Sequence, residues 1–400
     1  MAITDKEQGV WDLDEVYNKI NQGGIWSYDG IPQFMIWGGT AYGSLGLNES
    51  GTNPSNQPKK SSPTQIPGTT WQTEFYNSPS QAHTTILAKT DGTLWGFGKA
   101  QDWGQIGKNN RIDYSSPVQI GTNTNWKAGG GGREFSFAVR TNGTLWAWGT
   151  PAYGAQGQND LVSRSSPTQI PGTTWDNAWG YYESMLAIKT DGTLWGWGRA
   201  AGGELGLNQS PGNEISSPTQ VGTDTNWARC GSGGNYGAVG AIKTDGTLWT
   251  WGWNPNGCLG HNTHANPQYT GISSPTQIPG TNWEYFQACG NSTLAKKSDG
   301  TLWGWGSNGG MLGQNSTTKF SSPVQIPGTT WNRISGSGGN TIATKTDGTL
   351  WRIGGNGSGS LGQNDASQGS VSSPIQIPGT GWKTVGVTGE GNTMIATMVF

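Results

Sequence analysis

Charge is scarce in this chain of 400 residues, in which Lys, Arg, Asp and Glu make up 12% and the formal net charge is −2. Because there is no basic stripe, binding to nucleic acid or to an anionic membrane through bulk charge has no support. No apolar run approaches the roughly 20 residues of a membrane-spanning helix. Residues 1–7 also lack the basic and apolar regions of a signal peptide, so we expect synthesis in the cytoplasm and no membrane insertion.

Side chains for metal binding and catalysis are also few. The three cysteines, Cys230, Cys258 and Cys289, are too few and too unevenly spaced for a disulfide framework or a zinc site, and we interpret them as small buried or loop residues. His261 and His264 lie close together in the sequence, but no further ligand is near them. No nucleophile elbow occurs. The sequence therefore predicts a protein that is not an enzyme, with no catalytic residue, no cofactor and no metal.

Glycine and tryptophan, in contrast, are abundant, with 68 and 23 residues. The stretch 191–198, Asp-Gly-Thr-Leu-Trp-Gly-Trp-Gly, predicts a hairpin with a two-residue type I′ turn that leads into a strand. Trp195 and Trp197 are two positions apart and face the same side of that strand. The hairpin recurs at residues 91–98, 142–149, 245–252, 299–306 and 347–354. Because Asn142 replaces Asp in one copy, we attribute the recurring Asp to turn chemistry and not to catalysis.

The hairpin belongs to a unit of roughly 50 residues, a period typical of propellers and arrays. Each unit contains a Ser-Ser-Pro segment typical of an edge strand, a turn that ends in Trp, an alternating strand, and the hairpin followed by Gly-x-Leu-Gly-x-Asn. The Ser-Ser-Pro segments begin at Ser61, Ser115, Ser165, Ser216, Ser273, Ser321 and Ser372. The turns end at Trp71, Trp126, Trp175, Trp227, Trp283, Trp331 and Trp382.

The Ser-Ser-Pro segment occurs seven times, but the intact hairpin occurs only six times. Residues 34–38 match the Trp strand without a turn before it, and residues 391–397 match the alternating strand without a turn after it. The seventh hairpin is therefore divided between the two ends of the chain. For residues 31–400 we predict an all-β fold, a seven-bladed β-propeller closed by pairing of its N- and C-terminal strands.

Residues 1–30 stand apart from the repeat and are predicted to form a short N-terminal arm with one helix. Leu13, Val16, Tyr17 and Ile20 have the spacing of an apolar helical stripe. About ten helical residues are too few to be stable alone, so the stripe must pack on the propeller or on a partner. We predict a partner, with the arm as an anchor that binds it through Trp11, Leu13, Val16, Tyr17, Ile20 and Trp26.

The hairpin, Leu-Trp-x-Trp-Gly and Gly-x-Leu-Gly segments recur in register, and over residues 31–400 they resemble the regulator of chromosome condensation family of seven-bladed propellers. Secreted β-lactamase-inhibitor propellers share this repeat. The resemblance implies the fold, but it implies no site residue, since one fold hosts unrelated functions. The chromatin-bound members use a basic extension that is missing here, so a chromatin role is not expected.

Residues 9–17, together with the segment around Trp26, resemble the beginning of tail and other surface proteins of marine and cyanobacterial bacteriophages. This second resemblance implies a non-enzymatic virion structural protein, located in a tail fibre, an adaptor or the capsid surface. The arm would then bind other virion proteins through residues 1–30. The propeller would serve attachment or protein–protein contact, with a host surface glycan or protein as the target.

Recognition is expected where the repeats differ, and the candidate ligand-binding loops carry Trp103, Trp179, Tyr181, Tyr182, Tyr236 and Trp253. Exposed aromatic side chains on a rigid ring suit glycan or protein recognition. They leave open an alternative function, that of a lectin-like or inhibitor-like binding module. The same rings could instead fill gaps over the central channel. The Trp pairs that recur in the units are assigned to packing between blades.

Overall fold

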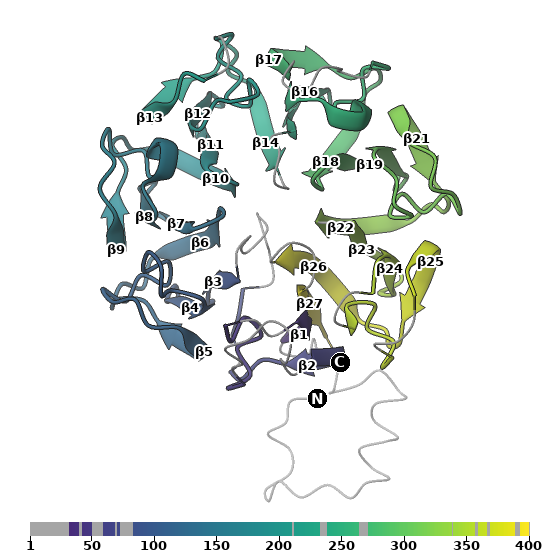
Figure 1. The fold of residues 1–400 in the computed structure, drawn as a ribbon, viewed down its shortest axis with the longest axis horizontal. Coiled ribbons are helices and arrows are strands. Elements are labelled where there is room, and N and C mark those ends of the chain that lie inside the picture. The colour runs from purple at the N-terminus through teal and green to yellow at the C-terminus, as the bar shows by residue number, and fades with distance from the viewer. Residues whose placement is uncertain are drawn as a thin grey trace, which may run out of the picture.

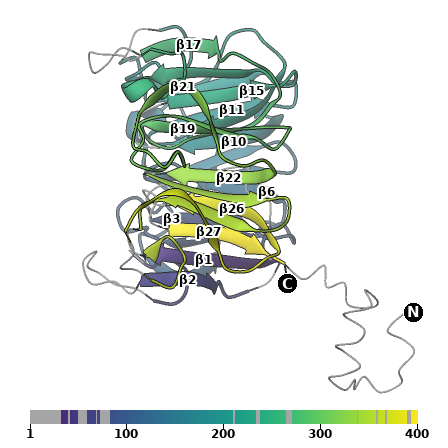
Figure 2. The same cartoon turned by 90° about the vertical axis from the view of Figure 1, so that its right-hand side faces the viewer.

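The computed structural model describes residues 32–39, 42–49, 59–68, 70–72, 83–209, 212–232, 238–263, 271–337, 339–356, 359–365, 369–388 and 393–399. Its strands form seven antiparallel sheets, which stand as blades around a central axis (Figure 1). In the side view the strands run from one face of the disc to the other (Figure 2). The predicted seven-bladed β-propeller is therefore confirmed. The described residues hold no α-helix, and short 3-10 turns are found at η2 (Ala152–Gly154) and η3 (Pro255–Gly257). The predicted arm, with its helix and its anchor residues Trp11, Leu13, Val16, Tyr17, Ile20 and Trp26, lies outside the described residues.

Six blades follow one another along the chain, and each is named here by its strands from the axis outward. Blade 1 contains β3 (Thr84–Ala88), β4 (Leu94–Gly98) and β5 (Tyr114–Gln119), and blade 2 contains β6 (Trp126–Gly131), β7 (Phe135–Arg140), β8 (Leu145–Gly149) and β9 (Arg164–Gln169). Blade 3 contains β10 (Trp175–Tyr181), β11 (Ser184–Lys189), β12 (Leu194–Gly198) and β13 (Ile215–Gln220), and blade 4 contains β14 (Trp227–Ser232), β15 (Ala238–Lys243), β16 (Leu248–Trp253) and β17 (Gly271–Gln277). Blade 5 contains β18 (Trp283–Ala288), β19 (Ser292–Lys297), β20 (Leu302–Gly306) and β21 (Phe320–Ile326), and blade 6 contains β22 (Trp331–Ser337), β23 (Asn340–Lys345), β24 (Leu350–Gly354) and β25 (Val371–Ile377).

Blade 7 joins the two ends of the chain. Its strands, from the axis outward, are β26 (Trp382–Thr388), β27 (Thr393–Met398), β1 (Gln33–Gly39) and β2 (Lys59–Gln65). Strands β1 and β27 pair antiparallel, with Ile36 opposite Ile395 and Trp37 opposite Met394. The hairpin that is divided between the chain ends is thus completed in space, and the predicted closure of the ring is confirmed.

The hairpin loops differ from the prediction. In blade 3 the backbone N–H of Lys189 donates to Thr193 O at 3.0 Å, and the N–H of Gly192 donates to Lys189 O at 2.9 Å. Gly192 has a φ of 76°, whereas Asp191 is not among the residues with positive φ. The loop therefore has three residues, a type I turn followed by a left-handed Gly, and the predicted two-residue type I′ turn is wrong. It would have required positive φ at Asp191 as well.

The face with the loops between the first and second strands and between the third and fourth strands of each blade is called the loop face here. On this face the Asn of each Gly-x-Leu-Gly-x-Asn segment has a φ between 50° and 59°, a left-handed conformation that Asn tolerates well. Its backbone N–H donates to the carbonyl oxygen of the first Ser in the Ser-Ser-Pro segment of the following blade, at 2.7–2.9 Å. The seven donor–acceptor pairs are Asn48–Ser115, Asn109–Ser165, Asn159–Ser216, Asn208–Ser273, Asn262–Ser321, Asn315–Ser372 and Asn364–Ser61. Two of the recurring motifs therefore join each blade to the next around the whole ring.

The core lies between adjacent blades. Trp197 of β12 is fully buried against blade 2, and its Nε1 donates to Ala155 O at 3.0 Å. A Cβ at Gly157 would come within 2.8 Å of that Nε1, so the second Gly of the motif makes room for the ring. Trp37, Trp148, Trp251 and Trp305 each bond the preceding blade in the same way. The predicted role of this recurring Trp in packing between blades is confirmed.

Candidate functional site

The recurring Asp and Thr side chains form hydrogen bonds within their own hairpin. Asp191 Oδ1 accepts hydrogen bonds from Thr193 N at 3.0 Å and from Thr193 Oγ1 at 2.7 Å. Thr193 Oγ1 in turn accepts one from Trp195 Nε1 at 2.9 Å. The Thr193 hydroxyl bond is the main reason that the pKa of Asp191 lies below its usual value. Five other hairpins repeat this relay, with Asn142 in the place of Asp in one of them.

The recurring Trp residues hold a cation between them. Lys189 Nζ lies 4.9 Å from the Trp175 ring centroid and 4.0 Å from that of Trp195, a cation–π geometry. Lys89, Arg140, Lys243, Lys297 and Lys345 occupy the same position in their blades. These contacts, like the relay, serve the scaffold. A functional site has to be sought where the blades differ.

Two of the predicted loop residues are not in an exposed loop. Trp179 and Tyr181 belong to the inner strand β10 and are buried, with 5% and 1% of their surface exposed. The Tyr181 hydroxyl donates to Glu204 O at 3.0 Å, and both rings pack in the core between blades 3 and 4. The expectation that they are exposed recognition residues is wrong, because β10 continues through the stretch that looks like a loop in the sequence.

The other predicted residues have different locations. Tyr236 lies outside the described residues. Trp253 ends β16 and is half-buried. Trp103 and Tyr182 are half-buried on the loop face, and each bonds a charged side chain of a neighbouring segment. Burial therefore excludes Trp179 and Tyr181 as exposed recognition residues, whereas Trp103, Tyr182 and Trp253 stay candidates for recognition.

Tyr182 is part of a stack of aromatic and cationic groups between blades 2 and 3. The guanidinium of Arg133 lies 5.0 Å from the Tyr182 ring centroid, and that of Arg199 lies 5.4 Å from it. Arg199 is also 5.7 Å from the ring of Tyr153. The order Tyr153, Arg199, Tyr182, Arg133 alternates rings and cations, and each contact has cation–π geometry.

A mostly buried acidic residue, Glu183, lies between the two arginines. The Glu183 side chain is only 11% exposed, and its carboxylate lies 3.6 Å from Arg133 NH1 and 4.0 Å from Arg199 Nε. Burial raises the pKa of Glu183 above its ordinary value, although both arginines act in the opposite direction. Arg133 NH1 also donates to the Tyr182 hydroxyl at 2.8 Å. The site therefore places two cations and two rings around a mostly buried acid, on which the charges of Glu134 and Glu214 also act.

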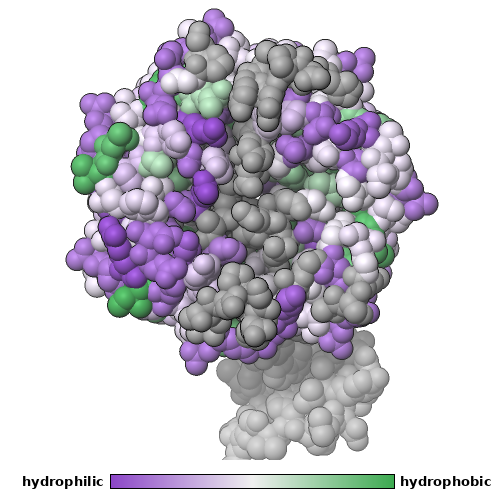
Figure 3. All heavy atoms as spheres, viewed as in Figure 1, coloured by the Kyte–Doolittle hydropathy of each residue, from purple (hydrophilic) through white to green (hydrophobic). Residues whose placement is uncertain are grey.

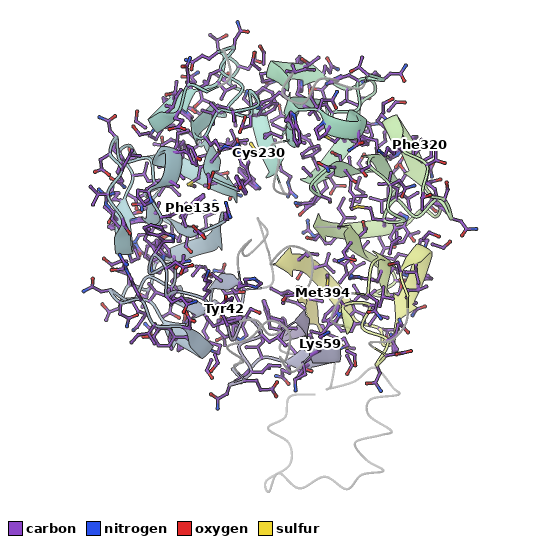
Figure 4. The ribbon with its side chains drawn as sticks, in the orientation of Figure 1. Tyr42, Lys59, Phe135, Cys230, Phe320 and Met394 are labelled. Carbon is purple, nitrogen blue, oxygen red and sulfur yellow. The ribbon has the colours of Figure 1, made fainter. Side chains whose placement is uncertain are left out.

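Related contacts occur at the two preceding blade junctions. Trp103 Nε1 of blade 1 donates to Glu134 Oε2 of blade 2 at 3.0 Å. Tyr42 of blade 7 lies under Lys99 of blade 1, with Nζ 5.1 Å from the ring centroid. The Tyr42 ring also contacts His83, with centroids 5.5 Å apart, and Figure 4 shows Tyr42 between these two blades.

Sequence analysis missed Tyr42, Tyr153, Arg133 and Arg199. A usable signal was present, because Tyr42, Trp103 and Tyr153 all stand directly before the first Gly of their Gly-x-x-Gly segment. The exposed aliphatic residues Ile112, Leu161 and Val162 were missed as well; they lie in the loops that follow β4 and β8. Figure 3 shows hydrophobic side chains at the rim of this face, over the blades of β5 and β9.

The three cysteines and His261 lie in buried or half-buried surroundings. His261 Nε2 lies 2.9 Å from Thr250 Oγ1, and burial lowers the pKa of the imidazole. The three cysteines are free and buried, and burial raises the pKa of Cys258 to about 12, which disfavours the reactive thiolate. Within the described ranges, no three His, Cys, Asp or Glu side chains gather in a way that could hold a metal ion. In that same part of the chain no helix is long and apolar enough to cross a membrane.

Comparison with known proteins supports the repeat. The family model for the regulator of chromosome condensation (RCC1) repeat matches residues 245–295. The protein RCC2 homolog of Danio rerio is 40% identical to this chain over 81 residues, which are 19% of this chain and 15% of that protein. The chain thus matches only a small part of the length of that relative.

Solved structures resemble nearly the whole ring. Human WBSCR16 is 19% identical, with a TM-score of 0.75 over 92% of this chain and 98% of that one. Prp20p from Saccharomyces cerevisiae, described together with its binding to Gsp1p and histones, is 16% identical, with a TM-score of 0.74 over 92% of this chain and 91% of that one. Yeast RCC1 (Prp20) with bound Kap60 is 15% identical, with a TM-score of 0.76 over 92% of this chain and 89% of that one. At these identities the likeness shows the fold alone, a seven-bladed propeller.

Proposed function

We propose that this protein is a non-enzymatic protein-binding module, in which the propeller is a rigid platform for contacts with other proteins. The observation that carries this proposal is that the polar groups of the recurring motifs form hydrogen bonds within the propeller itself. The Asn and Ser residues join blades, and the Asp, Thr and Trp residues form the hairpin relay. What differs between blades is a set of aromatic, arginine and aliphatic side chains, the residue types that are enriched in, or pack around, protein-binding hot spots. Prp20p, a propeller of similar fold, is described with its binding to Gsp1p and histones, which also favours protein partners.

We further propose that the assembly to which the module belongs is a virion, with residues 1–30 as the anchor. This rests on the apolar stripe of the arm and on the resemblance of residues 9–17 to phage surface proteins. A glycan-binding function has less support, because Trp179 and Tyr181 pack in the core and are not available to a sugar.

Deletion of residues 1–30 tests the anchor. The full chain should sediment with virions at a fixed stoichiometry, and the truncated chain should not. Thermal unfolding of both proteins is the control, since the propeller should unfold at the same temperature with and without the arm. If the truncated, folded chain still sediments with virions, the arm is not the anchor. If the full chain never does, the assembly is not a virion.

A further inference from the structure

We propose that one half of the loop face binds an acidic, extended protein segment that also carries apolar side chains. The binding surface, called the aromatic arc here, consists of Tyr42, Trp103, Tyr153 and Tyr182 with Arg133 and Arg199. This inference rests on the proposed function as a protein-binding module and names the class of partner.

The arc occupies only part of an otherwise repeated ring. At the position before the first Gly of the Gly-x-x-Gly segment, three successive blades carry Tyr42, Trp103 and Tyr153. The next three blades carry Gly202, Asn256 and Gly309 at the same position. Large rings therefore stand on blades 7, 1 and 2, and small or polar residues stand on blades 3, 4 and 5. The Gly-x-x-Gly segment that follows is present in all six blades, so that segment does not by itself require an aromatic residue before it.

Two of these rings are placed against local backbone preference. Tyr42 and Tyr153 have φ values of 56° and 53°, close to the 57° of Asn256 at the equivalent position. Asn is the usual non-glycine residue in this left-handed region, whereas a bulky residue there is uncommon. A Tyr at these two positions therefore has a backbone free-energy cost that Asn or Gly would largely avoid.

The charges of the arc favour an acidic partner. Glu134 already accepts the Trp103 indole N–H, and Glu183 is mostly buried between the two arginines. A guanidinium has five N–H donors, but Arg133 is 49% exposed and makes a single short hydrogen bond, to Tyr182. Arg199 approaches Glu183 no closer than 4.0 Å. Because neither arginine is within hydrogen-bond distance of Glu183, N–H donors of both remain available for carboxylates of a partner.

Apolar side chains continue the surface outward. Ile112, Leu161 and Val162 are 58%, 66% and 57% exposed, and they lie in the loops that also carry Trp103 and Tyr153. In blade 5 the corresponding loop carries Ser316, Thr317 and Thr318 instead. An interface core needs desolvated apolar and aromatic contacts around its charged pairs. Because the arc crosses three blade junctions, an extended segment matches it better than a compact group does.

A random peptide library displayed on yeast, sorted with the full-length protein, tests the proposal. Enriched peptides should carry Asp or Glu next to large apolar residues. One purified enriched peptide is then titrated by fluorescence anisotropy. Its affinity should fall about tenfold with Arg199→Ala and with Tyr153→Asn, the loss expected when an interface anchor is truncated. The second variant installs the residue that blade 4 carries at this position, so the fold should tolerate it.

Lys319→Ala is the matched control, because Lys319 Nζ donates to Asn256 Oδ1 at 2.7 Å on the opposite half of the same face. This variant should bind the peptide as the unaltered chain does. Enrichment of neutral or basic peptides, or equal losses in the control and arc variants, would overturn the proposal. Sedimentation of the arc variants with virions keeps the two proposals separate, because the anchor would be unaffected if only the arc assignment failed.

Discussion

The backbone N–H of Asn364 donates to the carbonyl oxygen of Ser61 at 2.8 Å, although the two residues belong to opposite ends of the chain. The same bond joins each of the other adjacent blade pairs, so the junction that closes the ring is built like the rest. The ring therefore has no special seam on the loop face.

The equivalence of these junctions predicts equal costs for equivalent changes. Replacing Asn364 or Asn208 with Ala should each lower the free energy of unfolding by about 1 kcal/mol, because Ala disfavours the left-handed backbone that the bond requires. Replacement with Gly should retain most of the stability. Chemical denaturation of the four variants checks this. A much larger loss at Asn364 than at Asn208 would show that the closing junction differs.

Thr193→Val should lower the free energy of unfolding by about 1–2 kcal/mol, because it removes the hydroxyl that bonds both Asp191 and Trp195. Thr190→Val in the same hairpin is the control, since Thr190 is exposed. Denaturant unfolding of both variants gives the comparison. If the two substitutions cost the same, the relay contributes nothing beyond β propensity.

Gly157→Ala and Gly222→Ala separate two roles of glycine. Both positions have positive φ, 68° and 61°, but an added Cβ meets the Trp197 indole at 2.8 Å in the first and nothing within 4 Å in the second. Gly222→Ala should therefore lower the free energy of unfolding only because Ala disfavours positive φ. Gly157→Ala should lower it by about 1–3 kcal/mol more, because the added Cβ overpacks the contact with Trp197. Thermal and denaturant unfolding measure the difference. Equal costs would contradict the close packing between blades.

The recurring hairpin carboxylates predict acid sensitivity. Hydrogen bonds from the following Thr lower the pKa of Asp91, Asp191, Asp245, Asp299 and Asp347 in the folded state. Their contribution to stability is present above the ordinary Asp pKa and is lost as the pH falls through the lowered value. A variant with Asn at all five positions, as Asn142 already shows, should lose less stability between neutral and acidic pH. Urea midpoints at several pH values check this, and an unchanged pH dependence would count against it.

The closed ring could be predicted from the number of copies of each recurring motif. Seven Ser-Ser-Pro segments against six hairpins require a hairpin divided between the ends, and β1 pairs with β27 accordingly. The turn type was not predictable from Asp-Gly alone, since Thr190 joins the loop and only Gly192 needs positive φ.

The candidate site was harder to predict, because burial depends on contacts distant in sequence. Trp179, Tyr181 and Tyr182 are close neighbours in the sequence, yet the first two pack in the core and the third stacks with Arg133 and Arg199. Arg133 is 49 positions away from Tyr182. Only the placement of neighbouring blades brings these groups together.

A saturation mutagenesis scan with two readouts, the abundance of folded protein and the binding of an enriched acidic peptide, tests the central claim most directly. That claim is that the repeated motifs build the ring and that function resides where the blades differ. Substitutions at Gly157, Thr193 and Asn208 should lower abundance and binding in parallel. Substitutions at Tyr153 and Arg199 should lower binding at unchanged abundance. The opposite pattern, with arc variants lost through misfolding or motif variants that lose binding while fully folded, would contradict the account.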